Sequence, residues 1–134
     1  MKPSQIAVLD FGSQYTHLIT RRIRQLGVLA TIYPPSVKAK DLKGTKGIIL
    51  SGGPSSVHDK TAIAYDKQLF KLGVPILGLC YGHQLITQHF GGKVKPGKTK
   101  EYGFASLKVV GKEELLTGVK SKRQVWMSHG DSVA

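Results

Sequence analysis

The sequence predicts an α/β fold with a mostly parallel sheet that carries helices on both faces. Short apolar runs alternate with amphipathic helical segments along the first two thirds of the chain, and glycine or proline closes most of them. Turn-rich segments with chemically useful side chains directly follow three of the apolar runs. Because the carboxyl ends of parallel strands share one edge of a sheet, a ligand site is expected at that edge.

The first half of the chain supplies three strands and one helix. Residues 6–10 form a buried strand, and from Tyr15 the apolar period becomes helical until Gly27 ends the helix. The apolar face expected to be buried consists of Tyr15, Leu18, Ile19, Ile23 and Leu26. The next elements are a strand over 28–33, a loop or short helix over 38–46, and a strand over 47–50.

The second half begins with the same alternation and then changes. A helix is expected over 62–72, with a face made of Ala62, Tyr65, Leu69 and Leu72. A strand over 74–79 leads into a helix that ends at Phe90. Beyond it, strands are expected at Val94, 102–110 and 124–127, with one helical turn over 113–116. No domain boundary is evident, so one domain is expected over 1–134.

The only cysteine lies between two glycines, in the arrangement Gly78-x-Cys80-x-Gly82. A strand precedes it and a helix follows, which is the layout of a nucleophile elbow. Side chains at either glycine would collide with the neighbouring strand and helix, and the N-terminus of a helix favours negative charge. The alternative is that Cys80 is a small buried apolar residue.

A second informative stretch is the loop Ser51–Pro54, which follows the strand over 47–50. Its adjacent glycines, Gly52 and Gly53, allow a backbone N–H to approach a ligand closely. A plain tight turn is the alternative interpretation of the same four residues.

The formal net charge is +12, from 20 lysines and arginines against 8 acidic residues. The basic residues are scattered and no aromatic residues alternate with them, so a solvated surface, or a face that meets an acidic partner, is favoured over direct nucleic-acid binding. One cysteine excludes an internal disulfide framework. No run reaches the length of a membrane span and no signal-peptide pattern is present, so a cytoplasmic protein without membrane contact is expected.

Four segments together resemble the class I (triad) glutamine amidotransferase domain. They are Asp10–Tyr15, Ser51–Pro54, Gly78–Gln84 and Val125–Asp131, and they occur in the order and at about the spacing of that class. The first and last segments select its GMP synthase branch. The resemblance covers almost the whole chain and implies a flavodoxin-like, three-layer fold.

The resemblance also implies roles for individual residues. Cys80 would attack the side-chain amide of glutamine to give a thioester and ammonia, while the backbone N–H groups of Gly53 and Tyr81 hold the oxyanion. The implied glutamine-binding residues are Gly52, Gln84, Ser128, His129, Gly130 and Asp131. Ammonia would pass to an ATP-pyrophosphatase domain or subunit that uses Mg-ATP to convert XMP to GMP. This chain itself would hold no metal or cofactor.

One part of the family pattern is absent. The triad of the class ends in a His-x-Glu pair beyond the segment equivalent to Val125–Asp131, whereas this sequence stops at Ala134. The expectation is a domain truncated at its C-terminus, without a strand and the catalytic base, whose turnover is lower by roughly 10²-fold or more. The other histidines are expected to have other roles: His17, His58, His83 and His89.

Three alternatives to a glutaminase follow from the same observations. The first is a non-catalytic module that binds glutamine or docks on a synthetase, because the base is missing. The second is a cysteine hydrolase of the related chaperone and peptidase group that carries the same elbow. The third is a nucleic-acid-binding protein, which the net charge alone would suggest.

Overall fold

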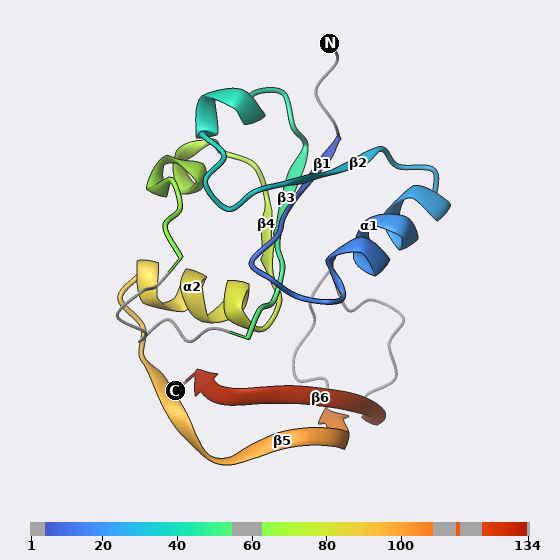
Figure 1. Cartoon of the computed structure of the whole chain (residues 1–134), viewed down its shortest axis with the longest axis vertical. Coiled ribbons are helices and arrows are strands. Elements are labelled where there is room, and N and C mark those ends of the chain that lie inside the picture. Colours follow the sequence, from blue (N-terminus) through green and yellow to red (C-terminus); the bar gives the residue numbers. More distant parts are fainter. Residues whose placement is uncertain (1–4, 55–62, 109–114, 116–121, 134) are drawn as a thin grey trace. The chain divides into compact units, whose positions relative to one another are not determined.

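The computed structural model describes residues 5–54, 63–108, 115 and 122–133, with side chains for 5–54, 63–95 and 115 (Figure 1). The chain divides into two compact units, and the expectation of one domain over 1–134 stays a prediction. The first unit comprises Met1–Val94 with Val133–Ala134, and the second comprises Lys95–Ser132. Each unit is described by itself below.

The first unit is built on a four-stranded sheet. Its strands are β1 (Ile6–Leu9), β2 (Ala30–Tyr33), β3 (Gly47–Leu50) and β4 (Ile76–Gly78). All pairs are parallel and the strand order is β2-β1-β3-β4. Leu9 at the end of β1 pairs with both Tyr33 and Leu50, so the carboxyl ends of three strands are level. This is the beginning of the flavodoxin-like order, and it confirms the predicted α/β fold.

Helices cover both faces of this sheet. In the order β2-β1-β3-β4, the chain moves in one direction across the sheet from β1 to β2 and in the other direction from β3 to β4. Right-handed connections between these parallel strands therefore cross opposite faces of the sheet. Figure 1 shows α1 (Thr16–Gln25) and α2 (Tyr81–His89) on opposite sides of the strands. Within the described residues, one cluster of buried apolar side chains joins the strands to η1, η2 and α2, namely Ala7, Leu9, Phe11, Ala39, Leu42, Ile48, Leu50, Leu69, Tyr81, Leu85 and Val94.

The predicted buried face of α1 was wrong for three residues. Tyr15, Leu18 and Leu26 are exposed by 45%, 44% and 81%, whereas Thr16 and Thr20 are buried. Threonine can face the sheet here because its hydroxyl finds partners. Thr20 Oγ1 donates to the carbonyl of Thr16 at 2.9 Å, and Thr16 Oγ1 lies 3.1 Å from Ser51 Oγ.

The predicted helix over 62–72 was also wrong. Residues 63–66 have no regular structure, and only a 3₁₀ helix follows, η2 (Lys67–Lys71). Asp66 is extended and its two carboxylate oxygens accept bonds from the backbone N–H groups of Gln68 and Ala39. Asp66 is thus the N-cap of η2, so the helix begins after it and not at residue 62. The bonds from the backbone N–H groups of Ala39 and Gln68 hold the pKa of the Asp66 carboxyl below its ordinary value. They also join η2 to the short helix η1 (Ala39–Leu42), which lies within the segment 38–46 as predicted.

The second unit contains a two-stranded sheet of β5 (Val94–Lys108) and β6 (Lys122–Val133), which run in opposite directions in Figure 1. The strand predicted at Val94 is therefore part of β5, and the strand predicted over 124–127 is part of β6. The strand predicted over 102–110 belongs to β5 up to Lys108, and residues 109 and 110 lie outside the described residues. The predicted helical turn over 113–116 lies outside the described residues except at Leu115. Within the described ranges, no helix is both long enough and apolar enough to cross a membrane.

Candidate active site

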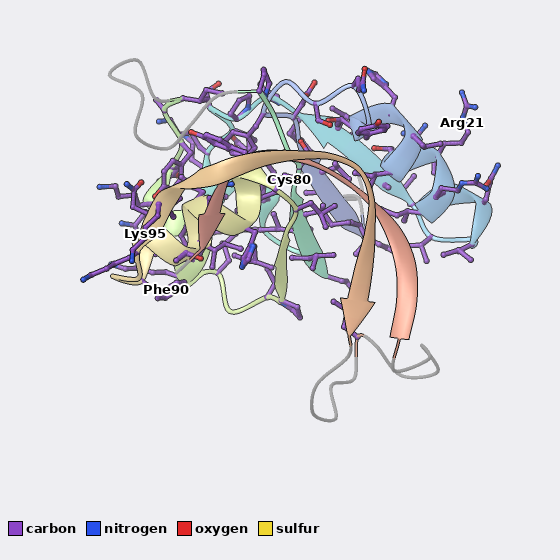
Figure 2. The ribbon with its side chains drawn as sticks, turned by 90° about the horizontal axis from the view of Figure 1, so that it is seen from below. Arg21, Cys80, Phe90 and Lys95 are labelled. Carbon is purple, nitrogen blue, oxygen red and sulfur yellow. The ribbon has the colours of Figure 1, made fainter. Side chains whose placement is uncertain are left out.

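Cys80 lies at the sharp turn between β4 and α2 (Figure 2). Its φ is 53° and its ψ is −112°, and no other non-glycine residue in the described ranges has a positive φ. Such a conformation is unfavourable for a side-chain-bearing residue and is found where the surrounding structure enforces it. The thiol is exposed, so the alternative of a small buried apolar residue is wrong. The strand-to-helix turn therefore has the backbone geometry that the sequence predicted for a nucleophile elbow.

The two flanking glycines make this turn possible. A Cβ on Gly78 would lie 2.6 Å from the carbonyl carbon of Gly82 and the nitrogen of His83. A Cβ on Gly82 would collide with the carbonyl oxygen of Leu50 and lie 2.6 Å from the Leu50 Cβ. The first turn of α2 therefore contacts β3 and β4 backbone to backbone, as expected from the Gly-x-Cys-x-Gly spacing.

Backbone hydrogen bonds hold the elbow on the sheet. The N–H of Leu79 donates to the carbonyl of Leu50 at 2.9 Å, which extends the β3–β4 pairing to the residue before Cys80. The N–H of Gly82 then donates to Leu79 and that of Gln84 to Cys80, both at 3.0 Å. The Cys80 thiol is thus fixed at the N-terminus of α2, where backbone N–H groups point towards a ligand.

The glycine loop after β3 lies directly against Cys80. A Cβ on Gly52 would be 3.0 Å from the Cys80 Cβ and 3.6 Å from its sulfur. A Cβ on Gly53 would collide with the carbonyl oxygen of Phe11. The structure therefore brings together the elbow, the Ser51–Pro54 loop and the turn after β1, as the shared sheet edge predicted.

Ser51 is a residue whose role the sequence analysis missed. It is fully buried, and its Oγ accepts a bond from the backbone N–H of Phe11 at 3.2 Å and lies 3.1 Å from the hydroxyl of Thr16. Thr16 also donates to Asp10 Oδ1, which accepts the N–H of Gly12 as well. The position of a hydroxyl directly after a buried strand was the available signal. This network connects the turn after β1 to the glycine loop beside Cys80.

Replacing Ser51 with alanine is expected to destabilise the first unit by about 1–2 kcal/mol, because the buried N–H of Phe11 loses its acceptor. Urea denaturation followed by circular dichroism would measure this. Ser13→Ala is the matched control, since the Ser13 hydroxyl accepts the N–H of Tyr15 at an exposed position. Equal stability of the Ser51 variant and the natural chain would contradict the structural role of Ser51.

The other predicted site residues fall into two groups. Tyr81 and Gln84 lie on the first turns of α2 beside Cys80, and both are buried. The segment of Ser128, His129, Gly130 and Asp131 lies in β6, in the second unit, and its side chains are outside the described set. Its position relative to Cys80 stays a prediction.

Three of the five histidines have described side chains, and these differ in their exposure and contacts. His17 and His83 are exposed, and His89 stacks on Phe70 with ring centroids 4.1 Å apart. His58 lies outside the described residues. Within the described ranges, the structure records no hydrogen bond between Cys80 and an imidazole, and no group of three potential metal-ligating residues.

Comparison with known proteins gives a consistent result along the chain. Residues 7–134 match the family model described as glutamine amidotransferase class-I. The chain is 50% identical over 131 residues to the GMP synthase [glutamine-hydrolyzing] of Enterococcus faecalis, and 52% identical over 130 residues to that of Bacillus cytotoxicus. Each match covers 96% of this chain and 25% of the relative, so the chain spans about a quarter of the length of these relatives.

Solved structures show the same fold. A protein of Thermoplasma acidophilum, provisionally described as one of the subunits of a GMP synthase, has a TM-score of 0.80 and 34% identity, covering 99% of this chain and 68% of that one. A glutamine amidotransferase from Thermotoga maritima has a TM-score of 0.75 and 18% identity, covering 96% of this chain and 61% of that one.

Proposed function

This chain belongs to the class I glutamine amidotransferase family, and we propose on that premise that it is the glutaminase part of a GMP synthase. The observation that carries the proposal is the turn at Cys80. An exposed thiol is held at a positive φ on the N-terminus of α2, with Gly52 against the sulfur. A conformation this unfavourable is expected where a nucleophile must be presented to a substrate.

The reaction we propose proceeds through a thioester. The Cys80 sulfur attacks the side-chain carbonyl carbon of glutamine, and the resulting oxyanion accepts bonds from the backbone N–H groups of Gly53 and Tyr81. The carbon–nitrogen bond then breaks, and ammonia leaves with a proton from a general acid. Water attacks the thioester, glutamate is released and the thiol of Cys80 is restored.

The remaining parts of the proposal concern the substrate and the partner. Glutamine would be held by Gly52 and Gln84 in the first unit and by the four residues Ser128, His129, Gly130 and Asp131. Ammonia would pass to an ATP-pyrophosphatase domain or subunit that uses Mg-ATP to convert XMP to GMP. The similarity to about a quarter of each GMP synthase supports such a partner. A free thiol nucleophile needs a reducing compartment, which favours the cytoplasm.

Trapping the covalent intermediate tests the proposed chemistry. The chain is incubated with glutamine, quenched in acid, digested and examined by mass spectrometry. We expect a glutamyl adduct on the peptide that contains Cys80, and none in Cys80→Ala. His83→Ala is the matched control, because His83 is an exposed neighbour on the same helix. Its adduct should equal that of the natural chain.

The same experiment separates the proposal from the binding-module alternative. Calorimetry with glutamine is run in parallel on the natural chain. Heat of binding without any adduct would favour a non-catalytic module that binds glutamine or docks on a synthetase. If the chain shows no heat of binding with glutamine and forms no adduct, the proposed substrate is contradicted.

A further inference from the structure

A cleft between α1 and β2 has no part in the proposed glutaminase chemistry. Its volume is about 410 Å³, within the range of small-molecule sites. The lining residues come from α1 and β2, namely His17, Thr20, Arg21, Arg24, Gln25 and Ile32. None of these is acidic, and neither is any other residue of α1. The cleft therefore carries an excess of positive charge.

The guanidinium of Arg24 is held in place in this cleft. Its Nε and one terminal nitrogen donate to the carbonyl oxygen of Ala30 at 2.9 and 2.7 Å. A guanidinium has five N–H donors, so these two bonds leave three for a ligand. Because the group is already fixed to the first residue of β2, little conformational entropy would be lost on binding.

Arg21 supplies a second guanidinium from the preceding turn of α1. It is exposed and projects from the helix in Figure 2. Residues three and four apart face the same side of a helix, which places His17, Arg21 and Arg24 along one side of the cleft. Within the described ranges, the structure records no ion pair for either arginine. Two guanidinium groups that form no ion pair within the described ranges can together bind an anion with several oxygen atoms.

The polar neighbours are consistent with an anion site. The Gln25 Oε1 accepts a bond from Arg22 at 3.3 Å, which leaves the amide NH₂ of Gln25 as a further donor. The hydroxyl of Thr20 already donates to Thr16, and Ile32 contributes apolar surface. We propose that this cleft binds the phosphate group of a small molecule. A carboxylate has two oxygens and would match one guanidinium, whereas a phosphate can accept bonds from both.

Isothermal titration calorimetry on the whole chain tests this inference, with inorganic pyrophosphate and AMP as separate probes. Arg21→Ala is expected to weaken binding about tenfold, the loss of a charge-assisted hydrogen bond. Arg21→Lys keeps the charge but not the fork and should weaken it less. Tighter binding of AMP would identify a nucleotide as the source of the phosphate group, and tighter binding of pyrophosphate an inorganic source.

The control is Lys40→Ala, which removes one positive charge from η1, outside the cleft. Arg22 is less suitable because it contacts Gln25. Lys40→Ala should change the affinity by less than about twofold at physiological salt. An equal loss in Arg21→Ala and Lys40→Ala, or no binding of either probe, would overturn the proposal. Cys80→Ala should bind both probes unchanged, so the result is independent of the proposed glutaminase.

Discussion

Cys80→Ala is expected to abolish glutamine-dependent GMP formation by the complete synthase, with a loss of about 10⁴-fold or more. The sulfur forms the proposed thioester, and no other thiol exists in the chain. The Cys80 side chain is exposed, so its truncation leaves the core intact. Spectrophotometric assay of XMP amination with saturating glutamine would measure the loss.

Added ammonium salt provides the control for this prediction. Free ammonia would reach the proposed synthetase without glutamine hydrolysis, so Cys80→Ala should keep ammonia-dependent GMP formation within about twofold of the unsubstituted protein. Loss of both activities would indicate that the substitution damages the partner or the fold. Retention of glutamine-dependent activity would contradict the role of Cys80.

Gly82→Ala is expected to destabilise the first unit by about 3 kcal/mol, at the upper end of the cost of overpacking. The added methyl group would collide with the carbonyl oxygen of Leu50, which is backbone and cannot move aside as a flexible side chain can. Relief requires the first turn of α2 to move away from β3. The same movement would displace Cys80 from Gly52, so alkylation of Cys80 by iodoacetamide should also change.

Gly91→Ala is the matched control for Gly82→Ala. Gly91 has a φ of +84° and nothing lies within 4 Å of a Cβ built on it, so only backbone strain of about 1–2 kcal/mol is expected there. Chemical denaturation of both variants gives the comparison. Equal destabilisation would show that the close contact with Leu50 contributes nothing.

The differences between the predicted and observed helices show which features an apolar sequence pattern fails to predict. The apolar period of α1 selected a face that includes Leu18 and Leu26, yet the structure buries Thr16 and Thr20 instead. Apolar periodicity treats threonine as neutral. It cannot anticipate that the Thr16 hydroxyl meets Ser51, 35 residues further along the chain. Likewise, Asp66 starts a 3₁₀ helix because its carboxylate also binds the N–H of Ala39, 27 residues earlier.

The sequence by itself determined the four strands of the parallel sheet, the helices that follow β1 and β4, and the strand-to-helix turn at Cys80. These depend on local spacing, and the Gly-x-Cys-x-Gly spacing specifies a turn that only small flanking residues allow. The tertiary structure alone decided which face of α1 is buried, the contact of Gly52 with the thiol and the cluster of arginines in the α1–β2 cleft. Each of these features is a contact between residues of different elements. The apolar periodicity of one segment does not specify which residues, distant in the sequence, will contact it.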